Sequence, residues 1–444
     1  MNAKSITLSV ALALVVGWPV MMSFAEDTVD FTGRGRMANQ HPKDGKENVE
    51  IVLLDIEEDQ PADVLQGQTY RANMQRTGVF KANGVPAFNE VKWKFKTGGK
   101  VRCSPVIVDG VVYVGSLDKN FYAINANDGT VKWKFETQGK IYSSPTIYDG
   151  LVYFSSFDGN CYALNITDGS LVWKIKGKKS DNWADDVILD GAPSSVCSPA
   201  ISYGLIFTPI KGAVQGFDLK TGKPVWESPT ACLARGMGST TISMGKVCHS
   251  FGEGRFGGWS IRSGKNVFTK ISGGVGFEMR VSTSAAIDGR IYDISHWGNV
   301  VCFDLRTCRE LWESSCGTTT GEKKKLGRLD ERAKFGVRMS SPSVTDKMLA
   351  VGLVTGVSGM DITSKAENKE KWFFKTGSRV LASPSIAGNT VYIGSENGIF
   401  YALDLDTGKE KWQFKTGGSI ISSAHIEGNN VYFGSDDGYV YCLK

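Results

Sequence analysis

A unit of about forty residues recurs along this chain, and it limits the possible folds more than any other feature. Its clearest copy is residues 131–170, VKWKFETQGKIYSSPTIYDGLVYFSSFDGNCYALNITDGS. The copy contains four short runs of β-branched and aromatic residues separated by Asp-Gly and Gly-Asn turn signals, which is typical of four antiparallel strands. Related copies occupy residues 91–130 and 371–411. Four strands in each unit of this length predict a β-propeller.

Two independent markers give the number of blades. Inner strands are expected to begin near Cys103, Ser143, Cys197, Ser239, Ser282, Ser340, Ala382 and Ser422. Outer strands are marked by Trp93, Trp133, Trp173, Trp226, Phe268, Trp312, Trp372 and Trp412. The last repeat ends after three strands, and residues 92–96 form an outer strand with no inner strands before it. We therefore predict an all-β, eight-bladed propeller of four-stranded antiparallel blades, closed by residues 92–96 beside the blade built from residues 419–443.

The tryptophans are interpreted as packing between blades. Several of them follow an Asp-x-x-Thr-Gly turn by four residues, as Trp226 follows Gly222 and Trp412 follows Gly408. This spacing lets the indole lie across the next blade, where burial removes roughly 150–250 Å² from water. A structural role is therefore expected for seven tryptophans, in preference to a substrate platform: Trp93, Trp133, Trp173, Trp226, Trp312, Trp372 and Trp412.

The chain begins with features of an export signal. Lys4 precedes an apolar run over residues 6–16, and Ser23-Phe24-Ala25 resembles a cleavage site, so residues 1–25 are predicted to be a signal peptide. The apolar run is short for a membrane span, and no cysteine follows the cleavage site, so neither a direct membrane anchor nor a lipid anchor is expected. We expect export to the periplasm or an equivalent extracytoplasmic compartment.

Residues 26–66 are expected to form an extended arm before the propeller of residues 67–444. Most of the arm is polar, but residues 49–56 read VEIVLLDI. This run, with Val49 and Ile51, favours either a strand on the side of the propeller or a strand added to the sheet of another protein.

Charge and cysteines exclude some functions. The formal net charge is +5, and few basic tracts occur, which disfavours nucleic acid as a partner. Nine cysteines leave at least one unpaired in an oxidising compartment. Cys197 and Cys232 lie on or beside inserted loops, and they are the candidate disulfide.

Two groups of residues are candidates for binding. Arginines near the start of the inner strands could form an anion site at the axis: Arg102, Arg280, Arg338 and Arg379. They could equally face solvent or pair with carboxylates between blades. Long insertions at residues 175–196, 227–238 and 313–337 all join an outer strand to the next inner strand, so they are expected at one face of the ring. Their partner-binding candidates are Trp183, Asp185, Asp186, Lys323, Lys324, Lys325 and Arg328, although loop variation without function is an alternative.

The repeat resembles that of pyrroloquinoline-quinone-type propellers. The resemblance rests on Ala-x-Asp-x-x-Thr-Gly-x-x-x-Trp, on Ser-Ser-Pro at the inner strand, and on Val-Tyr-x-Gly-Ser before the next turn, and it covers about residues 68–444. It implies an eight-bladed fold but not quinone binding, because the family includes redox enzymes and also cofactor-free scaffolds such as the outer-membrane protein assembly propeller. The segment from Tyr70 to Gly78 is similar to the lead-in of that family.

The enzymes of this family carry adjacent cysteines in a disulfide, a catalytic aspartate and calcium ligands. This sequence has no Cys-Cys pair and no Cys-x-x-Cys-His, and its four histidines are scattered. We therefore expect no cofactor, no metal and no catalysis, and we predict a scaffold or structural subunit that binds other proteins through its loops and arm. The alternative is a quinone-dependent oxidoreductase or electron-transfer protein, with pyrroloquinoline quinone and calcium at the axis. A carbohydrate binder would need exposed aromatic residues, and the candidates are Trp183, Trp259 and Trp297.

Overall fold

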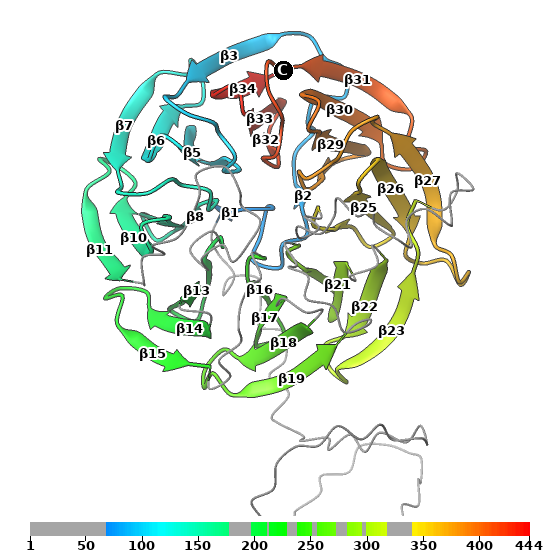
Figure 1. The fold of residues 1–444 in the computed structure, drawn as a ribbon, viewed down its shortest axis with the longest axis horizontal. Helices are drawn as coiled ribbons and strands as arrows, with labels where there is room; N and C mark the ends of the chain where they lie inside the picture. The colour runs from blue at the N-terminus through cyan, green and yellow to red at the C-terminus, as the bar shows by residue number, and fades with distance from the viewer. Residues whose placement is uncertain are drawn as a thin grey trace, which may run out of the picture. The chain divides into compact units, whose positions relative to one another are not determined.

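Eight four-stranded antiparallel blades form a closed ring in the computed structural model (Figure 1). The structure describes residues 68–176, 197–210, 213–228, 238–250, 255–271, 282–294, 299–317 and 340–444. The predicted all-β, eight-bladed fold is confirmed. Within these ranges no helix is long and apolar enough to cross a membrane.

Each blade is a meander whose first strand is innermost and whose fourth is outermost (Figure 1). Blades 1 to 4 are built from β4 (Val106–Val108), β5 (Val111–Gly115), β6 (Asn120–Asn125) and β7 (Val131–Glu136); β8 (Thr146–Tyr148), β9 (Leu151–Ser155), β10 (Asn160–Asn165) and β11 (Leu171–Lys176); β12 (Ala200–Ser202), β13 (Leu205–Ile210), β14 (Ala213–Asp218) and β15 (Pro224–Glu227); β16 (Thr241–Ser243), β17 (Lys246–Ser250), β18 (Arg255–Ser260) and β19 (Asn266–Ile271).

Blades 5 to 8 follow in the same order around the ring. They are built from β20 (Ala285–Ile287), β21 (Arg290–Ile294), β22 (Val300–Asp304) and β23 (Arg309–Ser314); β24 (Ser343–Val344), β25 (Met348–Gly352), β26 (Gly356–Asp361) and β27 (Glu370–Lys375); β28 (Ser385–Ala387), β29 (Thr390–Gly394), β30 (Ile399–Asp404) and β31 (Glu410–Lys415); β32 (His425–Glu427), β33 (Asn430–Gly434), β34 (Tyr439–Leu443) and the N-terminal β3 (Val91–Lys96).

The ring closes as predicted, by pairing of the two ends of the repeat array. β3 is antiparallel to β34, with Val91 opposite Leu443 and Lys96 opposite Tyr439. The backbone N–H groups of Asn89 and Glu90 also donate to the Lys444 carbonyl, at 2.9 and 3.0 Å. Blade 8 therefore holds the N-terminal and C-terminal parts of the propeller together, and it leaves no open edge between them.

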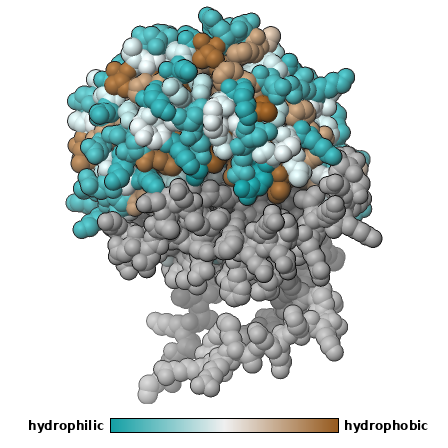
Figure 2. Space-filling view, turned by 45° about the horizontal axis from the view of Figure 1, so that its top comes forward, coloured by the Kyte–Doolittle hydropathy of each residue, from teal (hydrophilic) through white to brown (hydrophobic). Residues whose placement is uncertain are grey.

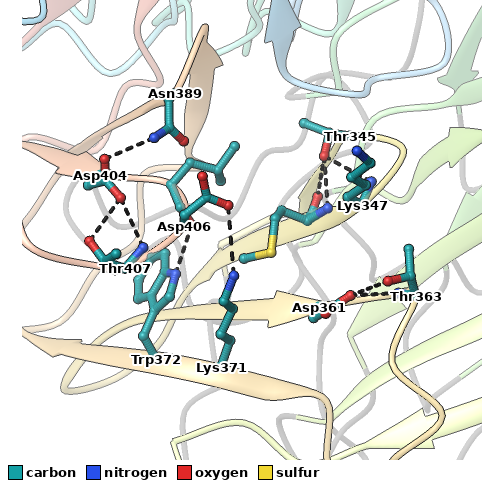
Figure 3. Close-up of polar contacts among 12 residues, drawn as sticks. Thr345, Lys347, Asp361, Thr363, Lys371, Trp372, Asn389, Asp404, Asp406 and Thr407 are labelled. Atoms are coloured by element: carbon teal, nitrogen blue, oxygen red, sulfur yellow. Dashed lines mark hydrogen bonds and ion pairs between the residues drawn. The ribbon is translucent and has the colours of Figure 1, made fainter.

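The tryptophans of the outer strands lie against the turn of the following blade. Trp372 lies beside the turn that carries Asp404 and Thr407 (Figure 3), and its Nε1 donates to the Leu405 carbonyl at 2.8 Å. Its ring packs against Gly408 in this Asp-x-x-Thr-Gly turn of blade 7. Gly408 has φ +69°, and a Cβ there would lie 2.5 Å from the indole, so glycine meets both the backbone and the packing requirement. Equivalent bonds to the next blade are made by Trp93, Trp133, Trp173 and Trp226.

Blade 8 has no such turn, because its third and fourth strands belong to opposite ends of the array. The N-terminal chain replaces the turn: Trp412 Nε1 donates to the Val85 carbonyl at 2.7 Å. Trp312 differs again, since the Lys369 ammonium lies 5.0 Å from its ring centroid. The outer tryptophan thus packs against the next blade in every case described, but its neighbour is a turn carbonyl, the N-terminal chain or a lysine.

A closed circle of hydrogen bonds joins the inner ends of all eight blades. In each blade a backbone N–H donates to a side-chain hydroxyl of the next blade, at 2.8 to 3.1 Å. The donors, in order, are Ser104, Ser144, Ser198, Ser239, Thr283, Ser341, Ser383 and Ser423, and the last donates back to Ser104 Oγ.

This circle explains why the inner strands begin two or three residues later than predicted. The Ser-Ser-Pro residues bond between blades and not along a β ladder, and proline has no N–H to contribute to one.

Candidate functional site

The axis of the ring is occupied by the chain itself, in residues 68–80, here called the axial segment (Figure 1). Its first strand, β1 (Gln68–Thr69), is antiparallel to the innermost strand of blade 2, and its last, β2 (Val79–Phe80), is parallel to the innermost strand of blade 7. Two blades therefore become five-stranded sheets. The sequence did not predict these two strands.

Between the two strands, the axial segment bonds one blade after another. Its carbonyls accept hydrogen bonds from inner-strand N–H groups of blades 4, 5, 6 and 7, at 2.8 to 2.9 Å. The pairs, donor first, are Ile242 with Met74, Ala286 with Gln75, Val344 with Thr77 and Ile386 with Gly78. Phe80 packs edge-on against His425 of blade 8, with ring centroids 4.8 Å apart. The axial segment thus satisfies inner-strand donors that would otherwise face an empty channel.

Two arginines fix the axial segment to the ring. Arg76 is fully buried, and its guanidinium donates to the carbonyls of Pro199 at 2.7 Å and Thr240 at 3.1 Å, in blades 3 and 4. Arg71 is 3% exposed and donates to the carbonyls of Thr283 and Pro342, in blades 5 and 6. Both guanidinium groups donate to carbonyl and hydroxyl oxygens of the axial segment and the inner strands.

Burial governs the electrostatics of these arginines. It lowers the pKa of Arg71 to about 10 and that of Arg76 to about 9, because the charged form loses its hydration. Both still carry a proton at neutral pH. The charge of each guanidinium is stabilised by backbone carbonyl oxygens of the inner strands. The signal available in the sequence was the Tyr70 to Gly78 lead-in, but arginine is seldom buried, so composition alone pointed to the surface.

The side chains of the axial segment bond blades 2 to 6 through hydroxyl groups and backbone carbonyls. Among the described residues no group of carboxylates gathers there that would suit a calcium ion held with a quinone.

Arg102 and Arg379 each bond a carboxylate on a turn between the second and third strands of a blade. Arg102 binds Asp436 of blade 8 through two nitrogens, at 2.9 and 2.7 Å, and Arg379 Nε lies 2.6 Å from Glu396 Oε2. Arg379 does not occupy the position of Arg102: its carbonyl accepts from Glu396 N–H as that of Lys100 accepts from Leu117 N–H. Arg280 and Arg338 lie outside the described residues, so an axial anion site stays a prediction.

The interior of blades 3, 4 and 5 is polar where the other blades are apolar. One buried position of the second strand holds Val114, Phe154, Val351, Ile393 and Phe433 in blades 1, 2, 6, 7 and 8. Blades 3, 4 and 5 place Thr208, His249 and Asp293 there, each at most 2% exposed.

Asp293 joins two of these blades. Its carboxylate accepts hydrogen bonds from Ser250 Oγ of blade 4 at 2.7 Å and from Ser282 Oγ of blade 5 at 3.0 Å. It also accepts from the Ile294 N–H at 2.9 Å. Three donors stabilise a buried carboxylate that an apolar neighbour could not.

Buried histidines and thiols add no reactive group. Burial lowers the pKa of His249 to about 4 and that of His425 to about 3, so both are neutral at pH 7. Burial raises the pKa of the Cys103, Cys161 and Cys197 thiols to about 12, which leaves almost no thiolate. No three His, Cys, Asp or Glu residues gather as metal ligands in the described part of the chain.

Most of the predicted contact residues lie outside the described residues. These are Val49, Ile51, Trp183, Asp185, Asp186, Cys232, Lys323, Lys324, Lys325 and Arg328, together with Trp297. Cys197 is buried and forms no disulfide with another described cysteine, so its pairing with Cys232 stays a prediction. Trp259 is fully buried, which removes it as an exposed carbohydrate platform.

The closed ring of eight four-stranded blades places this protein in the class of eight-bladed β-propellers, which includes quinoproteins and assembly factors. A family model described as outer membrane protein assembly factor BamB matches residues 81–314 and 298–444. The chain belongs to this family. Outer membrane protein assembly factor BamB of Xanthomonas campestris is 30% identical over 127 residues, which is 28% of this chain and 27% of that relative. The match therefore spans only about a quarter of that relative.

Solved structures show the same fold at low sequence identity. BamB from Moraxella catarrhalis has a TM-score of 0.59 and 17% identity, covering 80% of this chain and 97% of that one. A europium-containing methanol dehydrogenase has a TM-score of 0.61 and 14% identity, covering 84% and 91%. Scaffold and enzyme thus resemble this chain equally in fold, and the fold alone does not separate the two functions.

Proposed function

We propose that this protein is an exported, non-catalytic scaffold that holds other proteins of an extracytoplasmic assembly in fixed relative positions. The observation that carries the proposal is the filled axis. The axial segment lies along the innermost strands, and it bonds the blades to one another. A ring joined at its centre is stiff, which suits a protein that positions partners.

The family supports the same class of function. The matching family and the matching relative are both described as an outer membrane protein assembly factor, and a corresponding role in assembly is proposed for this chain. Export through residues 1–25 and a periplasmic location accord with that role.

The partner contacts are proposed at one face of the ring, here called the loop face, which is defined by residues 177–196, 229–237 and 318–339. The chain segments between β11 and β12, between β15 and β16, and between β23 and β24 all connect an outermost strand to the next innermost strand. The ends of β11, β15 and β23 and the starts of β12, β16 and β24 are expected on one side of the ring, because the strands of these blades run up and down in turn. The loop residues Trp183 and Lys323 and the arm of residues 26–66 are the proposed contacts.

Affinity purification from native membranes tests this proposal. The full chain should recover a defined set of extracytoplasmic proteins, and a variant with Lys323→Glu, Lys324→Glu and Lys325→Glu should recover markedly less. A matched variant, Lys371→Glu, Lys375→Glu and Lys411→Glu, makes the same change in charge on the outer strands of blades 6 and 7 and should recover the wild-type set. Equal recovery by all three proteins contradicts the loop-face assignment.

The quinone alternative has its own test. Pyrroloquinoline quinone with calcium should leave the melting temperature and the absorbance of the purified chain unchanged. A saturable rise in melting temperature, with dye-linked alcohol oxidation, would replace the scaffold by an oxidoreductase.

A further inference from the structure

The outer wall of the ring is unevenly charged. Five neighbouring outer strands, β27, β31, β3, β7 and β11, contain eleven lysines and three glutamates. The outer strands β15, β19 and β23 contain Lys270 and Arg309 against Glu227, Glu310 and Glu313. The positive charge is therefore concentrated on one arc of the wall. Figure 2 shows described surface that is mostly hydrophilic with isolated apolar residues.

Lysines on this arc differ in whether they are paired. On β31 and β3, Lys411 lies 3.5 Å from Asp404, Lys96 donates to the Asp437 carbonyl, and Lys94 lies over the Tyr439 ring. On β7 and β11, the exposed ammonium groups of Lys132, Lys134, Lys174 and Lys176 make no hydrogen bond or ion pair with any described residue. Four cations on adjacent blades thus remain available to an anionic partner.

Exposed apolar side chains lie at the start of the same two strands. Val131 on β7 is 43% exposed, and Leu171 and Val172 on β11 are 46% and 48% exposed. They are three of the five large exposed hydrophobic residues recorded for the described part of the chain. The blade 1 and 2 wall, defined as Val131, Lys132, Lys134, Leu171, Val172, Lys174 and Lys176, therefore offers apolar contact at one end and positive charge along the strands.

The backbone of this wall is also open to pairing. β7 and β11 each end the strand order of their sheet, so one edge of each has no strand partner among the described residues. Lysine on an edge strand discourages pairing with neutral or basic strands. The same lysines favour a strand that carries carboxylates, because cross-strand pairs of opposite charge are favourable.

We propose that the wall of blades 1 and 2 is a docking edge for an acidic, extended segment of another protein, which adds as a strand beside β7 or β11. Apolar residues of the segment contact Val131, Leu171 or Val172, and its carboxylates pair with the four lysines. A lipid surface fits less well: the exposed apolar side chains include no aromatic residue, and a convex wall that turns by ~45° per blade presents few lysines to a plane.

Binding of a labelled peptide tests the proposal on the full chain. The probe is a synthetic ten-residue peptide of alternating valine and glutamate, followed by fluorescence anisotropy. A variant with Lys132→Glu, Lys134→Glu, Lys174→Glu and Lys176→Glu should bind it at least about tenfold more weakly. The matched variant Lys371→Glu, Lys375→Glu, Lys411→Glu and Lys415→Glu on blades 6 and 7 should bind as the wild type does. Melting temperatures of both variants verify that the ring is intact.

Two further probes separate the alternatives. The same peptide with proline at alternate positions keeps the charge and loses backbone donors, so it should bind at least about tenfold more weakly. Equal binding of the proline peptide, or equal weakening by both variants, overturns docking at this edge. Sedimentation of the wild type with phosphatidylglycerol vesicles, without binding of the valine–glutamate peptide, would assign the wall to a membrane instead. The loop variant of Lys323 to Lys325 should bind the peptide normally, so this proposal and the loop-face proposal can fail separately.

Discussion

Blades 7 and 8 and blades 4 and 5 solve the same packing problem in opposite ways. Between blades 7 and 8, Phe400 and Phe433 stack with centroids 4.2 Å apart and planes at 5°. Between blades 4 and 5, Ser250 donates to Asp293 at 2.7 Å. Asp293 occupies the strand position of Phe433, and Ser250 lies one residue beyond that position on the second strand of blade 4. Phe121 and Phe154 repeat the aromatic solution between blades 1 and 2.

The comparison teaches that the ring has a regular arc, blades 6 to 8 with 1 and 2, and a polar arc, blades 3 to 5. Apolar stacking is non-directional and tolerates small shifts between blades, whereas a buried carboxylate depends on the geometry of its donors. The axial segment joins the two arcs, since Arg76 bonds blades 3 and 4 and Arg71 bonds blade 5 of the polar arc and blade 6 of the regular arc. We infer that the axial segment holds the two arcs together at the centre of the ring.

Removing the guanidinium of Arg76 should loosen this connection and give the largest effect. Arg76→Ala deletes bonds to five acceptors, leaves buried carbonyls without donors and opens a cavity. We expect a loss of about 4–5 kcal/mol in unfolding free energy, measured as a fall in the midpoint of urea denaturation. Arg379→Ala is the control, because its side chain is 61% exposed and should matter little. Similar midpoints for the two variants would contradict the role given to the axial segment.

Truncation of a stacked ring tests the regular arc. Phe400→Ala should cost about 3–5 kcal/mol, since Phe400 is fully buried against Phe433 and Trp412. Asp293→Asn keeps the shape but weakens the acceptor for Ser250 and Ser282, and it should cost about 1–3 kcal/mol. Denaturation midpoints of the two variants compare the arcs directly. If Asp293→Asn proves the more damaging, the polar arc is the better-packed half.

Acid should destabilise both arcs through one buried histidine in each. His425 and His249 are neutral in the folded ring because burial lowers their pKa to about 3 and about 4. The unfolded chain binds these protons near pH 6.5, so stability is complete above that pH and falls as pH drops below it. Each histidine should cost about 2–3 kcal/mol by a pH of about 4.5. His425→Ser, with the residue found at the equivalent Ser385, should flatten the plot of denaturation midpoint against pH. An unchanged slope would show that other groups control acid unfolding.

The repeat made the blades predictable, because each blade contains nearly the same local signals. Turn glycines, outer aromatic residues and inner serines recur at fixed spacing, and they located eight blades and the closing strand β3. The axial segment occurs once, so no internal copy revealed its role. Its bonds are to carbonyls, which carry no sequence signature.

Two residues that differ from the repeat can be related to each other only in the structure. Cys308 stands at the turn position of Gly129 and Gly408 and keeps a left-handed φ of 55°. In the structure it packs with Phe268, the one outer aromatic residue that is not tryptophan. A phenyl ring leaves room for a Cβ that an indole would not, since a Cβ at Gly129 would lie 2.9 Å from Trp93. We infer that the two differences compensate each other. The sequence alone could not show this, because it does not give the register between neighbouring blades.

The smallest prediction concerns a defect in the polar arc. In blade 4 the circle of inner hydrogen bonds runs through Ser239, at the position of Ser144 in blade 2, so Thr240 places a hydroxyl where blade 2 has Pro145. Thr240 Oγ1 is consequently buried with no hydrogen-bond partner in the described part of the chain. Thr240→Val replaces the hydroxyl by a methyl group of similar size, so it should raise the unfolding free energy by about 1 kcal/mol.

Removal of a hydroxyl that belongs to the circle of hydrogen bonds, in the regular arc, should have the opposite sign. Ser144 Oγ accepts the Ser104 N–H at 3.0 Å, so Ser144→Ala leaves that buried donor unpaired and should cost about 1–2 kcal/mol. Denaturation midpoints that move in opposite directions would show that the polar arc tolerates unsatisfied groups which the regular arc does not contain at this position. If Thr240→Val also destabilises the ring, the Thr240 hydroxyl has a partner in solution and blade 4 contains no such defect.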